Sequence, residues 1–246
     1  MTQPAFNPLE SPTGNRSTMT IPLNDGSSEQ VSIIVVHHNR PYYLNMCLQS
    51  IHCMSNLNNY EVIVVDNASD QETQEYLDVL QEEGIKVIRN DKNLYWSKAA
   101  NQGAKAADPN SKYLVFMHAD TIVLDQAWLD LLINISESNG AGIVGTQLQS
   151  YFIQKQKVDF IQEWCILITR QCWEDIGEWP ETLPLIGNSF IMTLRAQLKG
   201  HKPQATGNSI VHHYKAMCIN PSEFERISEQ SMAEIGKIYA ATRAIS

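Results

Sequence analysis

The sequence lacks an apolar run long enough to cross a membrane. A spanning helix needs about 18 consecutive apolar residues, and none of the 246 residues begins such a run. The amino terminus also lacks a basic segment followed by an apolar one, so no secretory signal is predicted. These two absences predict a cytoplasmic protein without a transmembrane segment.

Cysteine is scarce and follows no metal-binding or disulfide pattern. The five cysteines are Cys47, Cys53, Cys165, Cys172 and Cys218. Their number is odd and no two are spaced as C-x-x-C, which argues against a disulfide framework and against a zinc ribbon. We expect reduced thiols that are mostly buried.

Positive charge is also in short supply. Lys and Arg total 18 against 27 Asp and Glu, which gives a formal net charge of −9. A broad electrostatic surface for nucleic acid or anionic membrane is therefore disfavoured. The motifs G-x-x-x-x-G-K-[ST] and G-x-S-x-G are absent, so a P-loop nucleotidase and an α/β hydrolase each lack their signature.

What is present is an alternation of buried strands and amphipathic helices. Hydrophobic residues make up 43% of the chain, enough for a sizeable core. β-Branched or apolar runs predict strands at 31–36, 61–65, 86–89 and 113–117, and helical spacing predicts helices from Pro41, before Gly84, at 97–107 and at 125–138. This order predicts an α/β fold with a mostly parallel, doubly wound sheet.

The two ends and the second half of the chain differ from this pattern. Residues 1–28 carry four prolines and no periodicity, so we expect a flexible leader. After Gly145 the alternation becomes less regular, with a polar stretch to Asp159 and a helix predicted at 188–198. Residues 221–246 are expected to form a C-terminal amphipathic helix.

Polar residues follow each of the four predicted strands. They are His37-His38-Asn39-Arg40, Asp66-Asn67, Asn90-Asp91-Lys92-Asn93 and His118-Ala119-Asp120. Ligands of open α/β sheets bind beyond the carboxyl ends of the strands, so we expect one polar crevice there. A single polar residue after a strand is more often a turn or cap residue, and we assign Asp70 to a helix cap.

Four segments in this order resemble the family-2 glycosyltransferases of the GT-A fold, and the resemblance runs from Val31 to Tyr214. The segments are Val31-Ser-Ile-Ile-Val-Val-His-His-Asn-Arg40, Tyr60-Glu-Val-Ile-Val-Val-Asp-Asn-Ala-Ser69, Asn93-Leu-Tyr-Trp-Ser-Lys-Ala-Ala-Asn-Gln-Gly103 and Met117-His-Ala-Asp-Thr121. The third resembles the family's N-L-G-F-S-x-A-x-N-x-G segment, and the fourth stands where the D-x-D metal motif belongs. Later, Trp173–Gly177, Leu194–Ala196 and Val211–Tyr214 are similar to the family's acceptor-side segments.

The resemblance implies a single GT-A domain over 29–220, with a donor-nucleotide half at 29–120 and an acceptor half at 121–220. It implies transfer of a sugar from a nucleoside-diphosphate sugar, of the UDP or dTDP type, to an acceptor hydroxyl with inversion. The acceptor class stays open between a glycan, a lipid-linked group, a protein and a modified nucleic acid. A divalent metal, Mn²⁺ or Mg²⁺, is the implied cofactor.

The same resemblance assigns site residues. The implied donor-binding residues are His38, Asn39, Asp66, Asn93, Trp96, Lys98, Asn101 and Asp120, and the implied metal ligands are His118, Asp120, His212 and His213. Asp66 would accept a hydrogen bond from the base and His38 would stack on it. Lys98 or Asn101 would approach the phosphates or the sugar.

The chain departs from the family pattern at three positions. His118 replaces the first aspartate of D-x-D, and Tyr95 replaces a glycine. The usual acidic pair before L-x-x-R reads Asn188-Ser189, which removes the expected catalytic base. Candidates to replace this base are Glu163, Glu178 and Glu181. A second alternative is an unusually acidic acceptor, and a third is a catalytically impaired nucleotide-sugar-binding protein.

Overall fold

The computed structural model describes residues 31–55, 59–153, 156–207, 210–215 and 220–244. The predicted leader at 1–28 lies outside the described residues, as does Cys218. Of the other cysteines, all free thiols, Cys47, Cys165 and Cys172 are buried and Cys53 is exposed. No helix in the described part of the chain combines the length and apolar character of a bilayer span.

A seven-stranded sheet forms the centre of the fold. Its strands are β1 (Val31–His37), β2 (Tyr60–Asp66), β3 (Lys86–Arg89), β4 (Tyr113–His118), β6 (Ile143–Gly145), β9 (Cys165–Thr169) and β10 (Pro203–Ala205). They lie in the order β10-β6-β9-β4-β1-β2-β3. The pairs β1/β2, β1/β4, β2/β3 and β6/β10 are parallel, whereas β9 is antiparallel to both β4 and β6. The predicted mostly parallel α/β sheet is confirmed.

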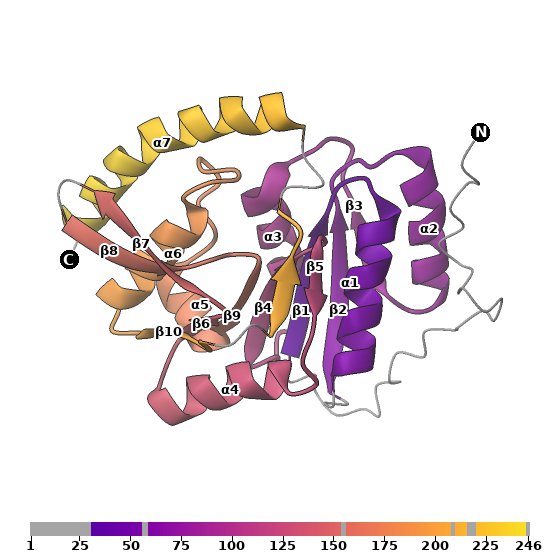
Figure 1. The fold of residues 1–246 in the computed structure, drawn as a ribbon, viewed down its shortest axis with the longest axis horizontal. Helices are drawn as coiled ribbons and strands as arrows, with labels where there is room; N and C mark the ends of the chain where they lie inside the picture. The colour runs from indigo at the N-terminus through magenta and orange to yellow at the C-terminus, as the bar shows by residue number, and fades with distance from the viewer. Residues whose placement is uncertain (1–30, 56–58, 154–155, 208–209, 216–219, 245–246) are drawn as a thin grey trace.

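Helices cover both faces of this sheet because its strands are apolar on both sides. The helices are α1 (Pro41–Met54), α2 (Gln71–Glu82), α3 (Tyr95–Ala106), α4 (Trp128–Asn139), α5 (Arg170–Ile176) and α6 (Asn188–Leu198). Residues of α1, α2 and α4 share one core with Ile33 and Val35 of β1. Residues of α3, α5 and α6 share the core on the other face of the sheet with Ile34, which lies between Ile33 and Val35 and points to the opposite side. Figure 1 shows this layered arrangement.

Gly103 lets α3 approach β1 closely. A Cβ atom at this position would lie 2.3 Å from Cγ2 of Ile34 and 3.2 Å from Cγ2 of Val65. Gly103→Ala is therefore expected to lower the free energy of unfolding by about 1–3 kcal/mol through overpacking.

Denaturant unfolding of Gly103→Ala measures this loss. Gly236→Ala is the matched control, because no heavy atom lies within 4 Å of the Cβ position there. The control is expected to be neutral or slightly stabilising, since Ala has the higher helix propensity. Equal stability of Gly103→Ala and the wild type would show that α3 can shift without cost.

The second half of the chain contains elements that the sequence did not predict. The polar stretch before Asp159 forms a hairpin of β7 (Leu148–Ile153) and β8 (Gln156–Ile161). Two further short strands, β5 (Thr121–Val123) and β11 (Val211–His213), pair antiparallel. The predicted helices at 188–198 and near 221–243 are present as α6 and α7 (Pro221–Ala244).

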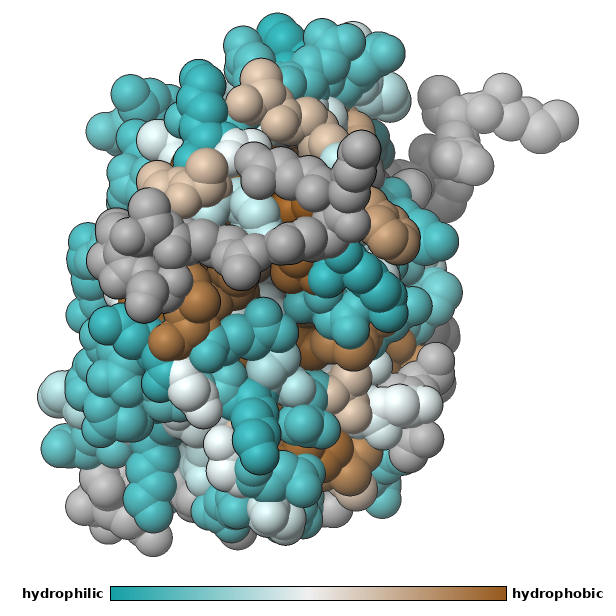
Figure 2. Space-filling view, turned by 90° about the vertical axis from the view of Figure 1, so that its left-hand side faces the viewer, coloured by the Kyte–Doolittle hydropathy of each residue, from teal (hydrophilic) through white to brown (hydrophobic). Residues whose placement is uncertain are grey.

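Helix α7 lies along α6 and the hairpin, across the top of the view in Figure 1. Its residues Ile235 and Tyr239 are buried in a small third core together with Phe190 of α6 and Ile153 of β7. Figure 2 shows the face of the molecule that carries α7 and the hairpin, where apolar surface lies among polar surface. The C-terminal helix is thus part of the folded unit.

Candidate functional site

The polar residues after the strands surround one cavity of about 480 Å³. His37 is the last residue of β1 and His38 follows it, Asn67 follows β2, and Asp120 lies just beyond β4; all four contribute to the lining of the cavity. The cavity lies at the carboxyl ends of the parallel strands, where the sequence predicted a polar crevice.

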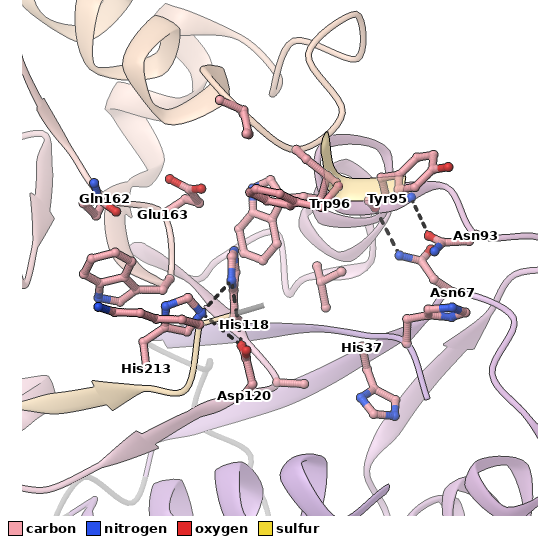
Figure 3. A pocket seen from close by; sticks show the side chains of 18 of the residues that line it. His37, Asn67, Asn93, Tyr95, Trp96, His118, Asp120, Gln162, Glu163 and His213 are labelled. Carbon is pink, nitrogen blue, oxygen red and sulfur yellow. Dashed lines mark hydrogen bonds and ion pairs between the residues drawn. The ribbon is translucent and has the colours of Figure 1, made fainter. Parts of the chain in front are cut away.

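Three of these groups converge at the end of β4. Nδ1 of His118 lies 3.3 Å from Nε2 of His213, and the same His213 atom lies 3.1 Å from Oδ1 of Asp120. His118 Nδ1 is 3.9 Å from that carboxylate oxygen. Figure 3 shows the three side chains pointing toward one another. Among the described residues, this is the one group of three or more His, Cys, Asp or Glu side chains that could hold a metal ion.

His213 comes 93 positions after Asp120 in the sequence, and strand pairing brings the two residues together. In the β5/β11 ladder His213 is opposite Thr121, next to Asp120. The backbone N–H of Tyr214 donates to the carbonyl oxygen of Asp120 over 2.9 Å. His212 faces the opposite way because side chains alternate along a strand, and it is exposed with its ring edge-on to Tyr214. The structure therefore does not bring the predicted ligand His212 into the cluster.

The cluster holds His118 in the protonation state that metal binding requires. Burial and the neighbouring His213 lower the pKa of His118 to about 3, with Asp120 opposing this shift. The ring is therefore neutral near pH 7 and can offer a lone pair. Trp164 stacks on His213 with ring centroids 5.1 Å apart, and Trp96 packs on His118 at 4.3 Å. Two imidazole nitrogens and one carboxylate oxygen, held in place by packing, suit a divalent ion such as Mn²⁺.

Asn93 lies in the loop that leads into α3, and Trp96 lies in the first turn of α3. Tyr95 has φ of 59°, in the left-handed region where glycine is favoured, which agrees with the glycine at this position in the family pattern. Oδ1 of Asn93 accepts from the Tyr95 N–H over 2.8 Å, and Nδ2 of Asn67 donates to the Tyr95 carbonyl over 3.1 Å. The Tyr95 hydroxyl donates to Glu223 of α7 over 2.6 Å. Hydrogen bonds therefore hold this strained turn at the cavity wall.

The loops after β1 and β2 are tied to each other. Asp66 is fully buried; its carboxylate accepts from the N–H and hydroxyl of Ser69 and from Nε2 of Gln74 at 2.7 Å. Oδ1 of Asn39 accepts from the N–H of Asp70. Asp70 itself caps α2 by accepting from the N–H of Thr73, as predicted. Asp66 and Asn39 thus shape the rim and do not line the cavity.

Two of the predicted donor-binding residues point away from the cavity. Lys98 is half exposed and pairs with Glu181 at 3.6 Å. Asn101 is buried, and its amide bonds both the N–H and the carbonyl of Trp179. Both residues follow Trp96 on α3, and the helical rotation turns them away from the face that carries Trp96. His38 and Trp96 do line the cavity.

The three candidate carboxylates lie in different surroundings. Glu178 pairs with Lys105 at 2.9 Å and Glu181 pairs with Lys98, both at the surface. Glu163 lines the cavity and accepts a hydrogen bond of 2.7 Å from the hydroxyl of Ser189. Burial raises the pKa of Glu163, while this hydrogen bond opposes the rise.

Several residues of the cavity wall were not predicted. Among them are Gln147, Gln162, Trp164 and Lys215. Asn67, by contrast, follows a predicted strand and was expected at the polar crevice, and it lines the cavity. Gln162 and Trp164 lie between β8 and β9, and no local motif marks that segment because its place depends on the unpredicted hairpin.

Comparison with family models gives a match over more than half of the chain. The model of the family described as "Glycosyl transferase family 2" matches residues 32–189. The O-antigen biosynthesis protein RfbC of Myxococcus xanthus is 23% identical over 224 residues, which cover 76% of this chain and 17% of that protein. The chain therefore spans a small part of the length of this relative.

Solved structures share the fold at low sequence identity. A mannosyltransferase of Pyrobaculum calidifontis, in complex with GDP-Man and Mn²⁺, superposes with a TM-score of 0.63 at 14% identity, covering 89% of this chain and 75% of that one. TarS 1–349 of S. aureus in complex with UDP gives 0.59 at 15% identity, covering 83% of this chain and 65% of that one. The family match over residues 32–189 and the shared GT-A fold place this chain in glycosyl transferase family 2.

Proposed function

We propose that the chain transfers a sugar from a nucleoside-diphosphate sugar to an acceptor hydroxyl, with inversion and with a divalent metal held by His118, Asp120 and His213. The observation that carries this proposal is the convergence of these three side chains within 3.9 Å of one another, inside the cavity at the strand ends. The names of the similar structures, which include GDP-Man, UDP and Mn²⁺, support the same reading.

A metal at this cluster would neutralise the negative charge that gathers on the leaving diphosphate. The surrounding residues would hold such an ion and limit the access of water to it. Trp96 and Trp164 cover the two histidine rings, and Asp120 is 5% exposed. We further propose that His38, which lines the cavity, stacks on the base of a UDP or dTDP donor, and that Asn93 and Asn67 position the loop against the donor.

Ligand-dependent thermal stability tests the proposal. UDP, dTDP, GDP and CDP are each added at saturation with manganese, with magnesium or with a chelator, because a ligand of the native state raises its stability by mass action. A metal-dependent rise for one or more of these nucleotides is expected, with UDP or dTDP giving the largest. The absence of any shift would contradict nucleotide-sugar binding at this cavity.

One observation favours a second candidate function. Asn188 and Ser189 replace the acidic pair of the family, so α6 begins without a carboxylate. A nucleotide-sugar-binding protein without turnover would bind the same ligands at the same cluster. Release of nucleoside diphosphate from a sugar donor separates the two functions, because only the transferase gives it.

A further inference from the structure

A second cavity of about 240 Å³ adjoins the first. The two share Gln149, Gln162, Glu163 and Ile186 in their linings. The far wall of the second cavity is apolar and aromatic, with Tyr151 and Phe160 from the hairpin, Phe190 from α6, and Met232 and Ile235 from α7. The shared residues thus stand between the proposed donor site and a chamber built from the acceptor half and the C-terminal helix α7.

Glu163 is set apart from the other acidic residues by its place between these chambers. Among the described residues, Asp120 and Glu163 supply the carboxylates of the first cavity, and Glu163 supplies that of the second. Asp120 is committed to the cluster with His213. In the view of Figure 3, His118 lies between Asp120 and Glu163. A carboxylate that lines both cavities is placed to accept a proton from an acceptor that attacks a donor across them.

The contact of Glu163 with Ser189 is the second independent observation. Ser189 stands at the start of α6, at a position where the family pattern carries an acidic residue. Its hydroxyl donates to Oε2 of Glu163 over 2.7 Å. The Glu163 carboxylate therefore reaches the space in front of α6 from a different segment, the connection between β8 and β9.

We propose that Glu163 is the general base of this protein, and that the acceptor hydroxyl reaches it through the second cavity. This inference rests on the proposed sugar transfer. The acceptor oxygen forms a bond to the anomeric carbon while its proton passes to a carboxylate oxygen of Glu163. The bond from the anomeric carbon to the diphosphate oxygen breaks, and its electron pair leaves with the nucleoside diphosphate.

The apolar second cavity supports this role. Aromatic and aliphatic side chains on one side of the carboxylate limit its solvation, which strengthens it as a base. The hydrogen bond from the Ser189 hydroxyl to Oε2 holds the carboxylate in place between the two cavities.

Glu163→Gln tests the assignment with water as the acceptor. Release of UDP, dTDP or GDP from UDP-glucose, UDP-GlcNAc, dTDP-rhamnose and GDP-mannose is measured with manganese. We expect Glu163→Gln to lower the rate by about 100-fold or more, the usual contribution of a general base, while the nucleotide-dependent thermal shift is unchanged. Glu181→Gln, which removes a surface carboxylate from the same half of the chain, is the matched control and keeps the wild-type rate.

The double variant Glu163→Gln/Ser189→Asp distinguishes the loss of a base from a structural effect of the substitution at Glu163. It moves the carboxylate to the first turn of α6, where a negative charge is also favourable for the helix. We expect it to recover a large part of the rate lost in Glu163→Gln. The wild-type rate should rise with pH as the base ionises, and Glu163→Gln should lack this rise.

Each outcome separates this inference from the proposed function. Absence of any metal-dependent nucleotide binding in the wild type overturns the proposed function. Nucleotide binding and turnover that survive in Glu163→Gln overturn the base assignment alone. Nucleotide binding without turnover of any donor by the wild type also overturns the base assignment and favours the binding function.

Discussion

Replacing His213 by alanine is expected to remove most of the stabilisation that manganese and a nucleoside diphosphate give together. A ligand at 100 times its dissociation constant contributes about 2.7 kcal/mol to the free energy of unfolding. His213 supplies Nε2 at 3.1 Å from the Asp120 carboxylate, so its loss leaves His118 and Asp120 as the remaining members of the cluster. Thermal or denaturant unfolding with and without the ligands measures the loss.

His212→Ala is the matched control for this experiment. It changes the same residue type at the neighbouring position of β11, but the side chain is exposed and lies outside the cluster. We expect it to retain the full ligand-dependent stabilisation. Equal effects of the two variants would contradict the assignment of the metal to this face of β11. Asp120→Asn is expected to behave as His213→Ala does.

Acidification is expected to destabilise the protein strongly, because His37 is buried as a neutral ring. Burial lowers the pKa of His37 from 6.5 to about 4; the nearby Asp66, Asp70 and Asp120 oppose this shift and His38 adds to it. Between pH 6.5 and 4 the unfolded chain binds a proton at this residue that the folded chain does not. Stability therefore falls as the pH falls through this range, by about 3 kcal/mol from His37.

Denaturant unfolding between pH 7 and pH 4, in the presence of a chelator, measures this dependence. His118, whose pKa is also lowered, adds to the loss in the same direction. His37→Leu removes one of the two groups and should flatten the dependence. A variant with the same pH dependence as the wild type would show that His37 does not carry this part of the acid sensitivity.

The sheet and its helices could be predicted because their signals are local. Strands β1, β2 and β4 are buried on both faces and read as unbroken apolar runs, and α1 repeats its buried Leu44, Cys47 and Ile51 at helical spacing. The hairpin β7–β8 was missed because five of the six residues of β7 are exposed, so the usual alternation is absent. Its partners are α6, β6 and β10, which sequence spacing cannot identify.

The site was predictable where residues follow directly after a strand. His118 and Asp120 were found in this way, and they lie together in the structure. The choice between His212 and His213 depended on which face of β11 turns toward β4. Lys98 and Asn101 were assigned by resemblance, but the rotation of α3 gives them surface and structural contacts instead. The place of Glu163 depends on the contact between the β8–β9 connection and α6, which is set by tertiary packing.

The cluster of His118, Asp120 and His213 and the cavity around it are proposed to carry out metal-assisted sugar transfer. Release of nucleoside diphosphate from the panel of sugar donors by the wild-type protein, with manganese and then with excess chelator, tests this claim most directly. We expect release from at least one donor with manganese and loss of that release with chelator. Metal-dependent nucleotide binding without release from any donor would contradict the claim.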